Sequence, residues 1–114
     1  MNVKRVLDSL NLDQIKTELT TKYHQKGSGR KPFNPLSMLK AQLVKHLLRI
    51  ISDRRLALRL RNDHRIARAC GFRRHTPSHS LFTHFRHRLG EETYQHIFNT
   101  LTKLLIESGT IIGR

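Results

Sequence analysis

The sequence is poor in several residue types, and each scarcity narrows what the chain can be. Cys70 is the only cysteine among 114 residues, which excludes an internal disulfide and suits a reducing compartment such as the cytoplasm. There is no Trp, and the few Tyr and Phe residues argue against a surface that stacks the bases of single-stranded RNA. No apolar run approaches the ~18 residues of a membrane span. Residues 1–10 also lack the apolar stretch of a signal peptide.

Acidic residues are scarce as well, with 8 Asp and Glu against 22 Lys and Arg. The formal net charge of +14 is concentrated in residues 22–88, which hold seventeen basic and two acidic residues. Such a charge predicts an anionic partner: a nucleic acid, a membrane surface or an acidic protein. The basic residues are spread over several expected helices instead of one amphipathic face, which disfavours a membrane. Because metal-assisted phosphoryl transfer needs clustered carboxylates, we expect no catalytic residues, no metal and no cofactor.

Apolar residues recur at helical spacing along most of the chain, and capping residues separate the periodic segments. The sequence therefore predicts an all-α single domain, a compact bundle of five to six helices with a helix-turn-helix-like core. The expected helices are Asp13 to about Tyr23, a central helix Leu36–Ile51 after Asn34 and Pro35, two short helices after Ser52 and Asn62, Ser78–Leu89, and Glu91 to about Ser108.

The single domain of residues 1–114 divides into three expected parts. Residues 1–28 form an N-terminal helix and arm, residues 29–108 form the core helical domain, and residues 109–114 are a short C-terminal remainder. The residues expected in the core are Leu39, Leu43, Leu47, Leu56, Leu60, Phe82, Phe85, Phe98 and Leu101.

The expected helix Ser78–Leu89 has an apolar stripe of Leu81, Phe82, Phe85 and Leu89. The opposite stripe carries short polar side chains that can exchange hydrogen bonds with base edges in the major groove: Ser80, Thr83, His84 and His87. A soluble helix with an ordinary polar face is the alternative interpretation.

Arginines accompany these helices with few acidic neighbours. Arginine makes bidentate hydrogen bonds to phosphate, so we expect phosphate contacts from Arg54, Arg55, Arg59, Arg73, Arg74 and Arg86. A solvated charged surface is the alternative.

Histidines are also frequent, and Cys70, His75 and His79 invite comparison with a zinc site. Their spacing matches no common paired-ligand pattern and a second Cys is missing, so exposed polar histidines are the better interpretation.

Two separate motifs carry a resemblance to a known family. The stretch from Gly29 to Leu36 reads Gly-Arg-Lys-Pro-Phe-Asn-Pro-Leu, and the stretch from Pro77 to Leu89 reads Pro-Ser-His-Ser-Leu-Phe-Thr-His-Phe-Arg-His-Arg-Leu. With the junction Ile50–Leu56 between them, the chain resembles the N-terminal helical domain of insertion-sequence transposases of the DDE class.

The resemblance implies a module that binds the element's ends in double-stranded DNA. It also implies that residues 109–114 are the start of a catalytic domain that the sequence does not contain, so the chain alone is expected to be inactive. A stand-alone helix-turn-helix regulator is the alternative function. Homodimerisation and a separately encoded catalytic domain remain open as partners.

Overall fold

The computed structural model of the protein describes residues 3–8, 15, 17, 19 and 33–107. The expected helix from Asp13 to Tyr23, the arm after it and residues 109–114 therefore lie outside the described residues, apart from Ile15, Thr17 and Leu19. In the described part every regular element is a helix, which confirms the all-α prediction.

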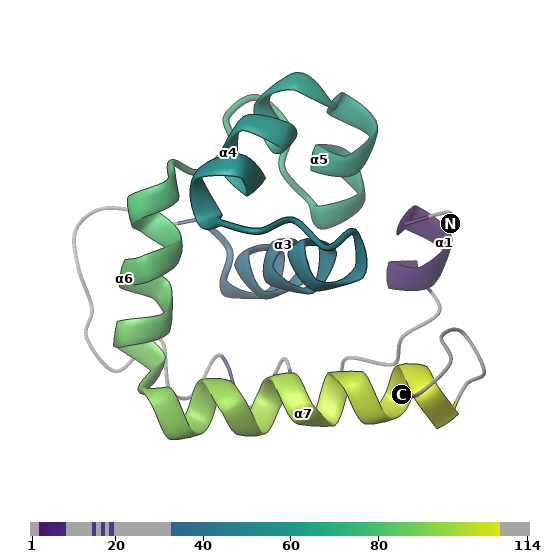
Figure 1. Ribbon diagram of the computed structural model, residues 1–114, viewed down its shortest axis with the longest axis vertical. Coiled ribbons are helices and arrows are strands. Elements are labelled where there is room, and N and C mark those ends of the chain that lie inside the picture. Colours follow the sequence, from purple (N-terminus) through teal and green to yellow (C-terminus); the bar gives the residue numbers. More distant parts are fainter. Residues whose placement is uncertain (1–2, 9–14, 16, 18, 20–32, 108–114) are drawn as a thin grey trace.

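The helices are α1 (Val3–Asp8), α3 (Pro35–Leu47), α4 (Asp53–Asn62), α5 (His64–Cys70), α6 (His79–Leu89) and α7 (Glu91–Glu107). Helix α3 lies at the centre and packs against α4, α5 and α6 (Figure 1). Helix α7 runs along the side of α3 that faces away from α4 and α5, and it packs against α6. Helix α1 packs against α5.

Local capping chemistry places most of the helix boundaries as expected. Asn34 Oδ1 accepts the Leu36 N–H at 2.9 Å, and Ser52 Oγ accepts the Arg55 N–H at 3.2 Å. Asp63 begins α5 by accepting two backbone N–H groups, and Gly71 and Gly90 follow α5 and α6 at positive φ angles of 105° and 87°.

The central helix ends at Leu47, four residues before its predicted end at Ile51. The Arg49 N–H donates to His46 O at 3.3 Å, and the Ile50 N–H donates to Lys45 O at 2.9 Å. This pair of bonds is a Schellman motif, and it places Arg49 in the left-handed region with φ of 54°. The predicted end was wrong because this motif usually has Gly at its left-handed position, and Arg49 gives no such signal in the sequence. Ile50 also fits the helical spacing of the apolar residues before it.

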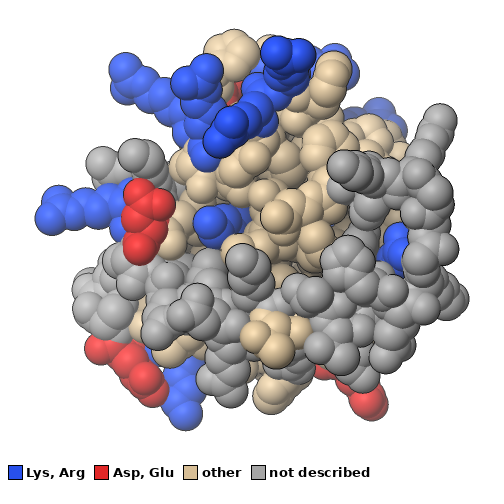
Figure 2. All heavy atoms as spheres, turned by 180° about the vertical axis from the view of Figure 1, so that it is seen from behind, with Lys and Arg blue, Asp and Glu red and all other residues tan. Residues whose placement is uncertain are grey.

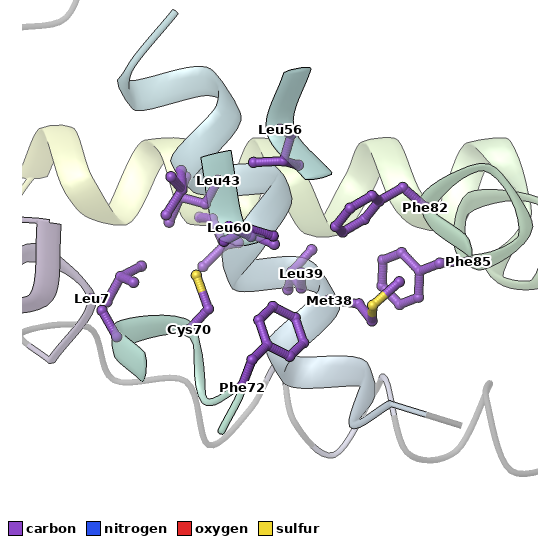
Figure 3. Packing of buried hydrophobic residues seen from close by; sticks show 14 of the residues in the cluster. Leu7, Met38, Leu39, Leu43, Leu56, Leu60, Cys70, Phe72, Phe82 and Phe85 are labelled. Atoms are coloured by element: carbon purple, nitrogen blue, oxygen red, sulfur yellow. The ribbon is translucent and has the colours of Figure 1, made fainter. Parts of the chain in front are cut away.

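One core is formed by side chains from all of the described helices (Figure 3). Leu39, Leu43, Leu56, Leu60, Phe82, Phe85 and Leu101 are buried as predicted, whereas Leu47 and Phe98 are only partly buried. Leu81, expected on the apolar stripe, is 38% exposed. The core face of α6 is centred on Phe82, Phe85 and Leu89, and Leu81 lies beside it, turned by the ~100° that separates neighbouring helical residues.

Candidate nucleic-acid interface

Helix α6 presents a polar face to solvent. Its core side is held by Phe82, Phe85 and Leu89, which are buried. The opposite side carries the four residues predicted to read bases, and all of them are exposed: Ser80, Thr83, His84 and His87. The sequence therefore predicted the exposure of this face correctly, and its side chains are open to solvent.

Arginines form a second exposed feature, which we call the arginine surface. It spans the α3–α4 turn, α4, α5 and the segment after α5, and its members are all exposed: Arg49, Arg54, Arg55, Arg59, Arg61, Arg65, Arg68, Arg73 and Arg74. Seen from behind, most Lys and Arg side chains project from the end of the molecule where α4 and α5 lie (Figure 2). The Asp and Glu side chains appear mainly at the lower edge and at one side.

The two acidic residues near this surface are occupied within the protein. Asp63 caps α5 through the N–H groups of Arg65 and Ile66 and lies 3.6 Å from Arg59 Nε. Asp53 points inward and pairs with Lys45 and Arg86. The arginine surface is therefore left with a large excess of positive charge, which attracts a polyanion.

Arg86 differs from the other arginines that were predicted to bind phosphate. Its Nη2 donates to Asp53 Oδ2 at 2.7 Å and its Nη1 donates to Gln42 Oε1 at 2.9 Å. Gln42 also donates to Asp53 Oδ1 at 3.1 Å and accepts the Tyr94 hydroxyl at 3.0 Å. The guanidinium of Arg86 thus joins α3, α4 and α6, and the structure gives it a role in holding helices together.

The charge state of this network follows from its contacts. Burial by itself raises the pKa of Asp53, but hydrogen bonds from Arg86, Gln42 and Lys45 outweigh it and lower the pKa to about 2. Burial raises the pKa of Tyr94 to about 12, so its hydroxyl keeps its proton and donates to Gln42. The network is therefore fully formed at neutral pH.

A groove of about 1030 Å³ brings the start of α6 next to α4. Its walls include Arg54, Arg55 and Arg59 of α4 together with residues 76–79, which lead into α6. A smaller hollow of about 240 Å³ contains Arg73 and Arg74. Arg61 and Thr76 line both, so the two groups of predicted phosphate ligands are neighbours.

The structure brings none of the four predicted base-reading residues to the lining of this groove. Ser78 and His79 are the last residues that line it, and Ser80, Thr83, His84 and His87 lie farther along α6. The groove's own apolar residues were missed at the sequence level. Leu58 is 56% exposed because it lies opposite the buried Leu56 and Leu60 on α4, and an apolar residue on an arginine-rich helix face could have been noticed.

The cysteine and histidine side chains in the described part of the chain form no metal-binding cluster. Cys70 is buried, and burial raises the pKa of its thiol to about 12, so the thiolate that a metal requires is disfavoured. His75 and His79 are exposed. Within the described ranges no three His, Cys, Asp or Glu residues lie close enough to hold a metal ion.

Helices α4, α5 and α6 follow one another as two short helices and a longer one, but their connections differ from those of a helix-turn-helix motif. Asp63 alone joins α4 to α5, and the eight residues 71–78 join α5 to α6. The usual turn of that motif has about 3–4 residues.

Among the described helices, none has both the length and the apolar character needed to cross a membrane.

Searches of the curated proteins and of the solved structures find no match to this chain. A family model described as "Transposase domain (DUF772)" matches residues 2–88, which include α1 and α3 to α5 and nearly all of α6. Since this match covers well over half of the sequence, the chain belongs to the transposase domain family DUF772.

Proposed function

We propose that this chain is the DNA-binding part of a transposase and that it recognises the ends of a mobile element as duplex DNA. One observation carries the proposal: the arginine surface, whose neighbouring carboxylates are used internally, adjoins the first turn of a helix with an exposed polar face. Membership in a transposase domain family supports this function over a stand-alone regulator.

The arginine surface would supply affinity that does not depend on sequence. Each phosphate that an arginine neutralises releases condensed counterions from the duplex, which favours binding and makes it sensitive to salt. Arg54, Arg55 and Arg59 line the groove beside the start of α6, and Arg73 and Arg74 line the neighbouring hollow. Arginines in both places would hold phosphates of the duplex and fix its position on the domain.

Helix α6 would supply the sequence preference. The major groove is about 12 Å wide and admits one helix, whose side chains meet the base edges. Ser80 directly follows His79, which lines the groove, and Thr83, His84 and His87 extend the same exposed face along α6. Strand cleavage and joining are assigned by this proposal to a separate catalytic domain, and the chain alone takes no part in them.

Mutations in the two features should have different effects on binding. The test begins by selecting a preferred duplex from a random pool with the wild-type protein. Thr83→Ala and His87→Ala should each reduce the free energy of binding to that duplex by about 1–3 kcal/mol and change binding to random DNA little. Arg54→Ala and Arg73→Ala should weaken binding to the selected duplex and to random DNA equally. They should also reduce the slope of log affinity against log salt concentration by about one unit.

The same measurements test a competing arrangement in which α4 enters the groove and α6 supports it. If Arg59→Ala removes the preference for the selected duplex while Thr83→Ala and His87→Ala leave it unchanged, the reading helix is α4. Arg88→Ala, on the same helix as Thr83 and His87 but outside the polar stripe, serves as the control for a general effect of altering α6.

A further inference from the structure

Ile51 is the most exposed of the large apolar residues in the described part of the chain. Its side chain is 78% exposed, compared with 56% for Leu58 and 43% for Ile106. It lies in the turn between α3 and α4, with Arg49 two residues before it and Arg54 three residues after it. An aliphatic side chain in such a position gains no stability from burial within the domain.

The turn that carries Ile51 is held on both sides. Before it, the bonds from Arg49 to His46 and from Ile50 to Lys45 close the end of α3. After it, Ser52 is extended and its hydroxyl caps α4. Arg49 adopts a left-handed conformation that non-glycine residues avoid, and such strain is concentrated at functional sites. Ile51 is therefore presented on a fixed, pre-organised support.

The surroundings of Ile51 indicate what it can contact. It lines the large groove with Leu58 and five arginines, and no Asp or Glu is among the residues that line this groove. A purely apolar partner would leave these guanidinium groups without counter-charges, except that of Arg59, which pairs with Asp63. A duplex offers both chemistries together, because anionic phosphates border a stack of apolar base faces.

We propose that Ile51 is an apolar wedge that enters a base step of the bound duplex, partly unstacks it and bends the DNA. The inference rests on the proposed DNA binding and adds to it an activity, deformation of the duplex. Arg49, Arg54 and Arg55 hold phosphates next to the opened step. Pyrimidine–purine steps kink most easily, so the wedge also favours sites that contain such a step at the right position.

Bending and unstacking can be measured on one duplex. A selected duplex of about 30 base pairs carries a fluorophore pair at its ends and, in a second preparation, 2-aminopurine in place of single adenines. Wild-type protein at saturation should increase energy transfer between the ends and increase 2-aminopurine fluorescence at one step. Ile51→Ala should bind within about threefold of wild type but lose most of both changes, whereas Ile51→Leu should keep them.

Ile106→Ala is the matched control, because Ile106 is also an exposed isoleucine but lies near the end of α7. It should bend and unstack the duplex as wild type does. Because Ile51 is 78% exposed, its substitution should leave the thermal midpoint unchanged. The inference is overturned if Ile51→Ala bends and unstacks the duplex like wild type, or if wild type binds and leaves it straight. Anisotropy in the same samples separates these results from an absence of binding, which would refute the proposed function itself.

Discussion

At the scale of single residues, the type of a side chain did not reveal its role. Arg86 follows the same sequence pattern as the other arginines, and its phosphate contact was predicted with theirs. Its partner Asp53 lies 33 positions away and Gln42 lies 44 positions away. No local pattern reports such distant pairing, whereas the exposure of Ser80 and Thr83 followed directly from helical spacing.

The network around Asp53 predicts a loss of stability on mutation. Asp53→Asn should lower the free energy of unfolding by about 2–3 kcal/mol, because Arg86 and Lys45 would lose their counter-charge in a partly buried site. Urea unfolding at pH 7 measures this change. Glu107→Gln, an exposed carboxylate at the end of α7, should change the free energy by less than about 0.5 kcal/mol.

The pH dependence of this contribution has a defined sign. Because folding lowers the pKa of Asp53 from 3.8 to about 2, its stabilisation is complete above pH 4 and is lost as the pH falls towards 2. The difference between wild type and Asp53→Asn should therefore shrink over that interval. An equal difference at pH 7 and pH 2 would show that the charge of Asp53 does not stabilise the fold.

At the scale of helices, the boundaries marked by a typical capping residue could be predicted from the sequence. The end of α3, which has no such residue, could not. The helix starts after Asn34 and Ser52 were predicted from their capping side chains, and the predicted end of α6 at Leu89 is the observed one. The end of α3 was missed because Arg49 occupies a position at which glycine is the usual residue. An arginine at this position belongs to the arginine surface that is proposed to bind DNA.

Arg49 should therefore show opposite effects on stability and on binding. Arg49→Gly should raise the free energy of unfolding by about 0.5–1 kcal/mol, since glycine adopts a positive φ without strain. It should also weaken duplex binding and reduce the salt slope by about one unit. Arg49→Ala removes the same charge but keeps the strain, so it should weaken binding equally without the gain in stability. Equal stability of the two variants would contradict a strained turn.

At the scale of the whole molecule, the distribution of charge matters more than its total. The sequence concentrates its net positive charge in residues 22–88, and in the structure the arginine surface lies at the α4 and α5 end. The all-α class followed from periodicity, but the groove between α4 and the start of α6 depends on how the helices pack. That packing requires contacts between distant parts of the chain, such as α3 with α6 and α7.

Salt dependence of duplex binding tests the central claim most directly. Anisotropy titrations of a labelled duplex are carried out between about 50 and 200 mM salt, where counterion release dominates affinity. If about six phosphates are neutralised, the plot of log affinity against log salt concentration should have a slope near −5. An affinity that does not change with salt, or no binding at about 50 mM, would contradict the account that the arginine surface binds DNA.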